Sequence, residues 1–220
     1  MGDETAPSRT RVRVWDVPTR LAHWLIALGV GLCWWTGDTG RLEWHRWSGY
    51  LLLGLVVFRV YWGFFGSATA RFRAFVRGPH TVVQYLQGRW AVQPGHNPLG
   101  ALSVLALLLL LALQVALGLF AVDVDGIESG PLSAWVSFKS GRAAAEWHGI
   151  VFKVLQALIA LHIVAIAWYR IVRREKLLGA MLHGHRDFPG SPPPPAKAPV
   201  LNFVIGALLA ALLAWLVTRA

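Results

Sequence analysis

Two histidines lie fourteen residues apart in a stretch that is otherwise almost entirely apolar, EWHGIVFKVLQALIALHIVAIAWY at 146–169. An imidazole ring among lipid tails costs free energy, so a histidine in such a place is expected to have a functional partner. Fourteen residues of α-helix turn through about 1400°, which is close to four full turns. His148 and His162 therefore share one helix face and lie roughly 21 Å apart along the axis.

Two further histidines lie near the ends of other apolar stretches, His23 in PTRLAHW and His45 in LEWHRWSGY. Because successive membrane-spanning helices run in opposite directions, His45 is expected level with His148, and His23 level with His162. Haem iron accepts axial histidine ligands, and two imidazoles at one depth can bind it from both faces. The four histidines therefore predict two haem sites at different depths in a helical bundle.

Two more polar residues are candidates for binding the cofactor. Arg59 follows His45 by the same fourteen residues and so reaches the level of His162. Its guanidinium would pair with haem propionates, or alternatively would extend to the lipid headgroups. His96, in PGHNPLGALS, would cap a helix or contact a propionate or a quinone rather than ligate iron. Four glycines would let a porphyrin approach closely or would serve plain helix packing: Gly29, Gly31, Gly49 and Gly54.

Five apolar runs are long enough to position these residues across a bilayer, which needs about 20 residues per helix. They lie at 21–37, 47–65, 98–122, 146–169 and 200–217, in a chain that is 55% hydrophobic. The sequence predicts an all-α integral membrane protein, a four-helix bundle that holds two haems, with a fifth C-terminal transmembrane helix. We expect residues 1–185 to form the di-haem cytochrome b domain, 186–199 a proline-rich linker and 200–220 the C-terminal transmembrane helix.

The charge distribution predicts the orientation of these helices. The formal net charge is +10, but the basic residues are concentrated on one side of the predicted spans. Lys- and Arg-rich segments stay in the cytoplasm, so the N-terminus is expected inside and the C-terminus outside. Topology accounts for the charge, and no nucleic-acid partner is expected.

The connecting segments have distinct expected structures. An Arg-rich tail to about Val14 is expected to be disordered, and PHTVVQYLQG at 79–88 is expected to form one short interfacial helix. The segment 123–145, on the outer side, is long enough to form a small cap or a docking surface. The single cysteine, Cys33, excludes an intramolecular disulfide.

Six motifs together resemble the bacterial cytochrome b561 family, which is related to the b-type cytochrome subunits of nickel-iron hydrogenases. They are RLAHW, WHRWSGY, FRVYWGFFGSATARFRAFVRGP, GHNPLGALS, ESGPL and EWHGIVFKVLQALIALHIVAIAWYRIV, within about residues 10–185. The resemblance implies a multi-pass protein of the bacterial inner membrane with two haem b groups per chain. By motif it assigns His45 and His148 to the outer haem, and His23 and His162 to the inner haem. The proline-rich spacer and the fifth helix depart from the family's pattern.

The resemblance also implies a function, electron transfer across the inner membrane between a periplasmic redox partner and the quinone pool. The partner is expected to be a c-type cytochrome, an enzyme subunit or a small species such as superoxide, which would make the protein a quinone-linked oxidoreductase. Basic residues around the outer entrance would attract such an anion: Arg41, Arg46, Lys139, Arg142 and Lys153. We expect quinone near the inner haem, close to Arg59, Arg71, Arg73, Arg77 and His96.

One alternative belongs to another class, a histidine-lined transporter or proton path without haem. Such a path requires further polar side chains along the helices, whereas Gln114 is almost the only one in 98–122. A homodimer is compatible with this sequence.

Overall fold

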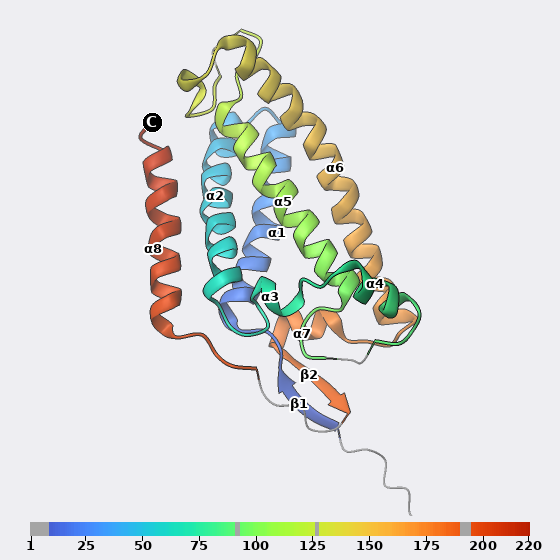
Figure 1. Ribbon diagram of the computed structural model, residues 1–220. Coiled ribbons are helices and arrows are strands. Elements are labelled where there is room, and N and C mark those ends of the chain that lie inside the picture. The colour runs from blue at the N-terminus through green and yellow to red at the C-terminus, as the bar shows by residue number, and fades with distance from the viewer. Residues whose placement is uncertain (1–8, 91–92, 126–127, 190–194) are drawn as a thin grey trace, which may run out of the picture.

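The computed structural model describes residues 9–90, 93–125, 128–189 and 195–220. Its main elements are five long helices that lie side by side (Figure 1). They are α1 (Val17–Asp38), α2 (Leu42–Phe65), α5 (Pro98–Phe120), α6 (Phe138–Ile171) and α8 (Val200–Val217). All five are long and apolar enough to cross a membrane, which confirms the prediction of an all-α membrane protein with five candidate transmembrane helices.

The two ends of the bundle carry different structures (Figure 1). One end, called the sheet end below, holds β1 (Arg9–Arg13), α3 (Phe72–Phe75), α4 (Pro79–Leu86), α7 (Leu177–His183) and β2 (His185–Pro189). The other, called the loop end, holds the α1–α2 turn and the 121–137 connection with the short helix η1 (Ser133–Trp135). Helix α4 confirms the short helix expected between the second and third long helices.

Side-chain caps fix where three of the long helices begin. Asp16 Oδ1 accepts from the Thr19 amide at 2.8 Å, and Asn97 Oδ1 accepts from the Gly100 amide at 2.7 Å. Ser137 caps α6 in the same way, so this helix starts eight residues before the predicted apolar run. Its 34 residues span roughly 51 Å, more than the ~30 Å hydrocarbon core, so α6 extends beyond the bilayer.

An apolar core fills the middle of the four-helix bundle. Val56 of α2, Leu111 of α5 and Leu155 of α6 are buried there against one another. Leu155 is 2% exposed, and it lies seven residues from both His148 and His162. The core therefore separates the two predicted histidine levels with a purely hydrocarbon layer.

The sheet end has a small core of its own. Strands β1 and β2 pair antiparallel, with Val12 opposite Arg186, and Val12 and Phe188 are buried together with Trp15. The expectation of a disordered tail up to Val14 was therefore wrong for residues 9–13. Residues 186–189, assigned above to the linker, form most of β2. Val12, the one apolar residue of β1, is buried, and the arginines on either side of it hide the strand in the sequence.

The fifth long helix packs closely against α2 (Figure 1). A Cβ atom added at Gly206 would lie only 2.6 Å from Tyr61 Cδ1, and one added at Gly54 would lie 3.5 Å from the Ala210 carbonyl oxygen. The Asn202 side chain donates to the Phe65 carbonyl at 2.8 Å. Small residues thus let α8 dock as a regular part of the fold.

Exposed tryptophans gather at the loop end of the bundle. Eight tryptophans have at least half of their surface exposed. Trp168 lies near the C-terminal end of α6 and Trp215 near the end of α8, and the other six lie at or near the loop end: Trp34, Trp35, Trp44, Trp47, Trp135 and Trp147. Tryptophan rings prefer the level of the lipid headgroups. This belt therefore marks a membrane–water interface at the loop end.

Candidate functional site

The histidines of α2 and α6 meet inside the bundle near the loop end. The ring centroids of His45 and His148 lie 6.0 Å apart, and the two ring planes are at 80°. Two imidazoles that bind one metal from opposite sides, with metal–nitrogen bonds of about 2.0–2.1 Å, have ring centroids about 6 Å apart. The spacing of this loop-end pair fits a haem iron between the rings.

Both rings of the loop-end pair are held in the same way by the backbone. His45 Nδ1 lies 2.9 Å from the Cys33 carbonyl oxygen, and His148 Nδ1 lies 2.9 Å from the Gln114 carbonyl oxygen. A carbonyl oxygen can only accept, so each Nδ1 carries the hydrogen. In a neutral imidazole this leaves the lone pair on Nε2, the atom available for a metal.

The histidines nearer the sheet end are arranged differently. His162 Nδ1 lies 3.3 Å from the Ser103 hydroxyl, while the His23 ring packs edge-on against Trp24. In the described part of the chain, the loop-end pair is in ring contact and His23 and His162 are not. This sheet-end pair therefore stays a prediction from the levels of α1 and α6.

Arg59 lies inside the protein at the level of the sheet-end pair. It is 8% exposed, and its guanidinium carbon lies 5.5 Å from the centre of the Phe72 ring. The side chain therefore does not reach the surface, as the lipid-headgroup alternative requires. Within the described residues, Arg59 Nη1 and His23 Nδ1 are buried without a hydrogen-bond partner. Unpaired buried donors of this kind fit the carboxylates of a bound haem.

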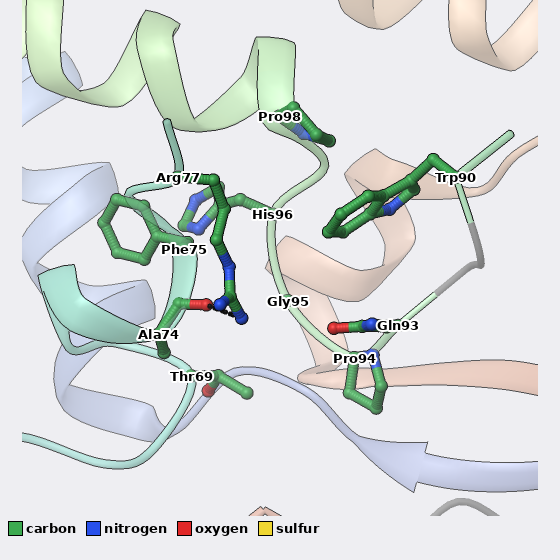
Figure 2. Close-up of a pocket in the computed structure, with 10 residues that line it drawn as sticks. All are labelled: Thr69, Ala74, Phe75, Arg77, Trp90, Gln93, Pro94, Gly95, His96 and Pro98. Carbon is green, nitrogen blue, oxygen red and sulfur yellow. Dashed lines mark hydrogen bonds between the residues drawn. The ribbon is translucent and has the colours of Figure 1, made fainter. Parts of the chain in front are cut away.

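His96 lies just before α5, next to Phe75 (Figure 2), and also contacts Trp15. Its ring centroid is 4.5 Å from that of Trp15 and 4.6 Å from that of Phe75. Asn97 caps α5, so His96 is not the cap. Burial, together with the nearby charge of Arg59, lowers the pKa of His96 to about 3, so the ring is neutral at physiological pH. The small cavity beside it holds about 20 Å³, enough for a single water molecule.

A larger cavity lies between the start of α1, the end of α2 and the segment that leads into α8. It holds about 270 Å³ and is lined mainly by apolar side chains, among them Trp62 and Phe203. Ser67 also lines it, and this buried hydroxyl has no partner among the described residues. Asp16 is at its edge, where its Oδ2 accepts from the Trp62 indole at 3.0 Å. The sequence carried no sign of this cavity, because residues about 180 positions apart build it.

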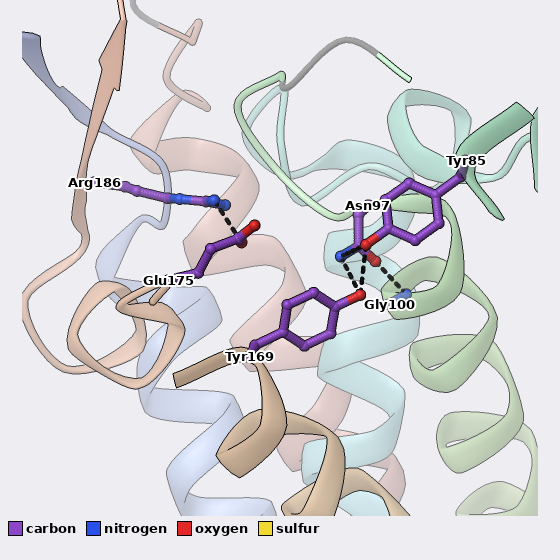
Figure 3. A network of polar contacts seen from close by, with 6 residues as sticks. All are labelled: Tyr85, Asn97, Gly100, Tyr169, Glu175 and Arg186. Atoms are coloured by element: carbon purple, nitrogen blue, oxygen red, sulfur yellow. Dashed lines mark hydrogen bonds and ion pairs between the residues drawn. The ribbon is translucent and has the colours of Figure 1, made fainter. Parts of the chain in front are cut away.

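A polar cluster fastens α4, α5 and α6 together at the sheet end (Figure 3). The hydroxyls of Tyr85 and Tyr169 are 2.5 Å apart, and Asn97 Nδ2 donates to both. Burial and the hydrogen bond with Tyr169 raise the pKa of Tyr85 well above its usual range. Nearby, Arg186 of β2 pairs with Glu175 at 2.7 Å, which joins the ribbon formed by β1 and β2 to the segment that follows α6.

The basic residues at the loop end are partly engaged with the protein itself. Arg46, next to His45, pairs with Glu128 at 2.6 Å, and Arg142 donates to the Val122 carbonyl at 2.8 Å. These contacts hold the 121–137 connection beside the loop-end pair. They leave fewer free cations there to attract a small anion.

The role of the four predicted glycines beside a porphyrin stays a prediction. Among the described atoms, a Cβ at Gly31 or Gly49 would meet nothing within 4 Å, and one at Gly29 would meet Leu52. The glycines that do touch candidate ligands are Gly37 and Gly118, which sequence reasoning missed. Their contacts depend on neighbouring helices, so no local motif reveals them.

Comparison with known proteins gives one family. The model described as prokaryotic cytochrome b561 matches residues 14–184. The probable Ni/Fe-hydrogenase B-type cytochrome subunit of Azotobacter chroococcum mcd 1 is 27% identical, with 85% of this chain and 93% of that protein covered. The proteins of the same name from Azotobacter vinelandii and Rhizobium leguminosarum bv. viciae are 26% and 24% identical, with 85% and 84% of this chain and 93% and 92% of the relatives covered. No solved structure matches the chain.

The family match spans all four bundle helices and every candidate ligand. B-type cytochromes carry haem b and transfer electrons, which favours electron transfer over the histidine-lined transporter. The chain is a membrane b-type cytochrome that belongs to the prokaryotic cytochrome b561 family, distantly related to the B-type cytochrome subunits of Ni/Fe-hydrogenases.

Proposed function

We propose that this cytochrome binds two haem b groups and carries electrons across the membrane between them. His45 and His148 would hold the loop-end haem, and His23 and His162 the sheet-end haem. The observation that carries the proposal is the loop-end pair, whose rings lie 6.0 Å apart with both Nδ1 atoms bonded to carbonyls. Among the described residues neither Nε2 atom has a hydrogen-bond partner, and nothing in a simple packing role requires both to be left free.

Bound haem supplies one-electron oxidation and reduction at its iron. The protein's residues position the two groups and exclude water from the space between them. The layer around Val56, Leu111 and Leu155 is buried and apolar, so it offers no polar path for protons between the two levels. Arg59 would pair with a propionate at the sheet end, where its Nη1 atom has no described partner.

We place the quinone in the 270 Å³ cavity at the sheet end. Ligand pockets have volumes of roughly 300–1,000 Å³ and apolar walls with a few polar groups, so this cavity is near the size that a quinone ring needs. The Ser67 hydroxyl is a buried hydrogen-bond donor on its wall, and Asp16 at its edge can accept a proton. The 20 Å³ space beside His96, where the sequence suggested quinone, is too small.

The orientation follows from the charges. Most basic residues outside the spans belong to the sheet end, including Arg71, Arg73, Arg173 and Arg174, so we place this end in the cytoplasm. The loop end then faces the periplasm, with the 121–137 connection available for a partner. Because the relatives are named hydrogenase cytochrome subunits, a redox enzyme subunit is the partner we propose. The engaged Arg46 and Arg142 argue against a superoxide site.

A reduced-minus-oxidised absorption spectrum with haem quantified per chain tests the two-site proposal. The wild type should bind two haems, His45→Ala and His23→Ala one each, and the His148→Ala/His162→Ala double variant none. His80→Ala, which changes an exposed histidine of α4, is the control and should keep two. A wild-type protein without haem, or a double variant with an unchanged spectrum, would contradict the proposal.

A further inference from the structure

Two glycines touch the loop-end histidines, one on each side. A Cβ atom added at Gly37 would lie 3.1 Å from His45 Nδ1 and 3.3 Å from its Cε1. One added at Gly118 would lie 3.0 Å from His148 Cε1 and 3.3 Å from its Nδ1. Carbon atoms in good contact are about 3.5–4.0 Å apart, so both rings occupy space that any other residue would need.

The same two glycines follow the carbonyls that hold the rings. Gly37 comes four residues after Cys33 in α1, and Gly118 comes four residues after Gln114 in α5. In an α-helix the Cα–Cβ bond tilts toward the N-terminus, so a side chain covers the turn before its own Cα. The side chain at position i+4 therefore lies over the carbonyl of residue i. Glycine at i+4 leaves that carbonyl open to a ring from a neighbouring helix.

Each opened carbonyl can serve two donors. A backbone oxygen has two lone pairs; within the helix it accepts the amide of residue i+4, which is the glycine itself. The second lone pair can accept the imidazole Nδ1–H at 2.9 Å. At Cys33 the Thr36 hydroxyl is a further, longer contact at 3.2 Å, since it donates mainly to the Leu32 carbonyl at 2.7 Å. The arrangement occurs twice, on α1 and on α5, with the same spacing and the same ring atom.

We infer that Gly37 and Gly118 are positioning residues for the loop-end haem ligands, which open a backbone carbonyl so that it fixes the orientation and tautomer of each histidine. This inference rests on the proposed haem site. It gives a role in that site to α1 and α5, which supply no ligand to the loop-end haem. A hydrogen bond from Nδ1–H to a carbonyl makes the imidazole a more basic ligand. A more basic ligand stabilises ferric iron, so the bond should keep the reduction potential of this haem low.

The sheet-end pair lacks this arrangement. His162 Nδ1 faces a hydroxyl, Ser103 Oγ at 3.3 Å, and His23 Nδ1 is buried without a described partner. The two sites therefore differ in how strongly the protein polarises its ligands. Alanine at Gly37 or Gly118 should alter the loop-end haem and leave the sheet-end haem unchanged.

The test is a redox titration with haem quantification on purified protein. Gly37→Ala and Gly118→Ala should each either raise the midpoint potential of one haem or lower the haem content from two to one per chain. Gly78→Ala and Gly149→Ala, at exposed positions where a Cβ meets no described atom within 4 Å, are controls and should keep both haems at wild-type potentials. The EPR signal of the altered haem should also shift, because it depends on the orientation of the two imidazole planes.

Each other outcome decides against the inference. If all four variants match the wild type, the glycines do not position the ligands, although the two-haem proposal stands. If all four lose haem alike, or if Gly37→Ala and Gly118→Ala lose both haems, the glycines serve general packing. Should Gly118→Ala fail to accumulate in the membrane, Gly37→Ala tests the same contact on the other ligand. Absence of haem from the wild type would overturn the proposed function itself.

Discussion

Removing the buried charge of Arg59 should lower the reduction potential of the sheet-end haem. Arg59 follows His45 by fourteen residues, as His162 follows His148, so its charge is level with the sheet-end ligands. Neighbouring helix axes are about 8–10 Å apart. We use this spacing as the distance between the guanidinium charge and the proposed position of the iron, about 9 Å. A cation at that distance stabilises the added electron, and Arg59→Leu removes this stabilisation.

The size of the effect follows from Coulomb's law. At an effective dielectric constant of about 20, two unit charges about 9 Å apart interact with about 1.8 kcal/mol, which corresponds to about 80 mV for one electron. The loop-end haem, about 23 Å away, should shift by only about 30 mV. The fold should tolerate the change, since Arg59 Nη1 has no protein partner among the described residues; the contact with Phe72 and the proposed propionate pair are lost.

The assay is a potentiometric titration of both haems in the wild type and in two variants. Arg73→Leu is the matched control, because it removes the same charge from an exposed position at the same end of the bundle. Water screens an exposed charge about four times more strongly, so this control should shift the sheet-end potential by about 20 mV. Equal shifts of both haems in Arg59→Leu, or no shift, would refute the assignment of Arg59 to the sheet-end site.

Three further changes test other parts of the structure. Gly206→Leu should displace α8, since a Cβ there already meets Tyr61. The rate of quinone reduction should then fall while the haem content stays at the wild-type value. Ala211→Leu, on the exposed face of α8, is the control and should have no effect. Leu155→Ala opens a cavity in the central core and should lower the free energy of unfolding by about 2–5 kcal/mol, measured by thermal unfolding. The control Leu161→Ala changes a side chain that is 61% exposed and should leave the unfolding curve unchanged. The pKa of His96 is lowered to about 3 in the folded protein. Below pH ~6.5 the unfolded chain therefore binds a proton that the folded chain does not, so the free energy of unfolding decreases as the pH is lowered. His96→Phe should therefore keep about 1–3 kcal/mol more stability than the wild type near pH 4.5, and equal acid unfolding curves would contradict this.

The sequence predicted most of what depends on helix geometry and chain direction. The number of long helices and the common level of His45 and His148 follow from a regular rise per residue and alternating direction. The sequence could not show which carbonyls hold the rings, because the Cys33 and Gln114 oxygens have no side-chain signature. The contacts of Gly37 and Gly118 with these rings could not be predicted either, because they depend on how the helices pack.

Long-range contacts limited the prediction at the sheet end. The partner strand of β1 begins at His185, and alternation over five residues is a weak signal when arginines fill every second position. The start of α6 was placed too late because apolarity was used to mark it, whereas the Ser137 cap begins the helix in a more polar stretch. The 270 Å³ cavity needed the packing of α8 against α2, which composition does not encode.

The β1–β2 ribbon has a consequence for the order of folding. Its first strand is synthesised before α1, yet Arg9 pairs with Pro189, which follows the last bundle helix. The ribbon can therefore close only after all four bundle helices have been made, so it is a late step with high contact order. Closure joins the start of α1 to the end of α6, the helices that carry His23 and His162. Until then the two helices can separate, which gives a large planar cofactor a period of access before the bundle is locked.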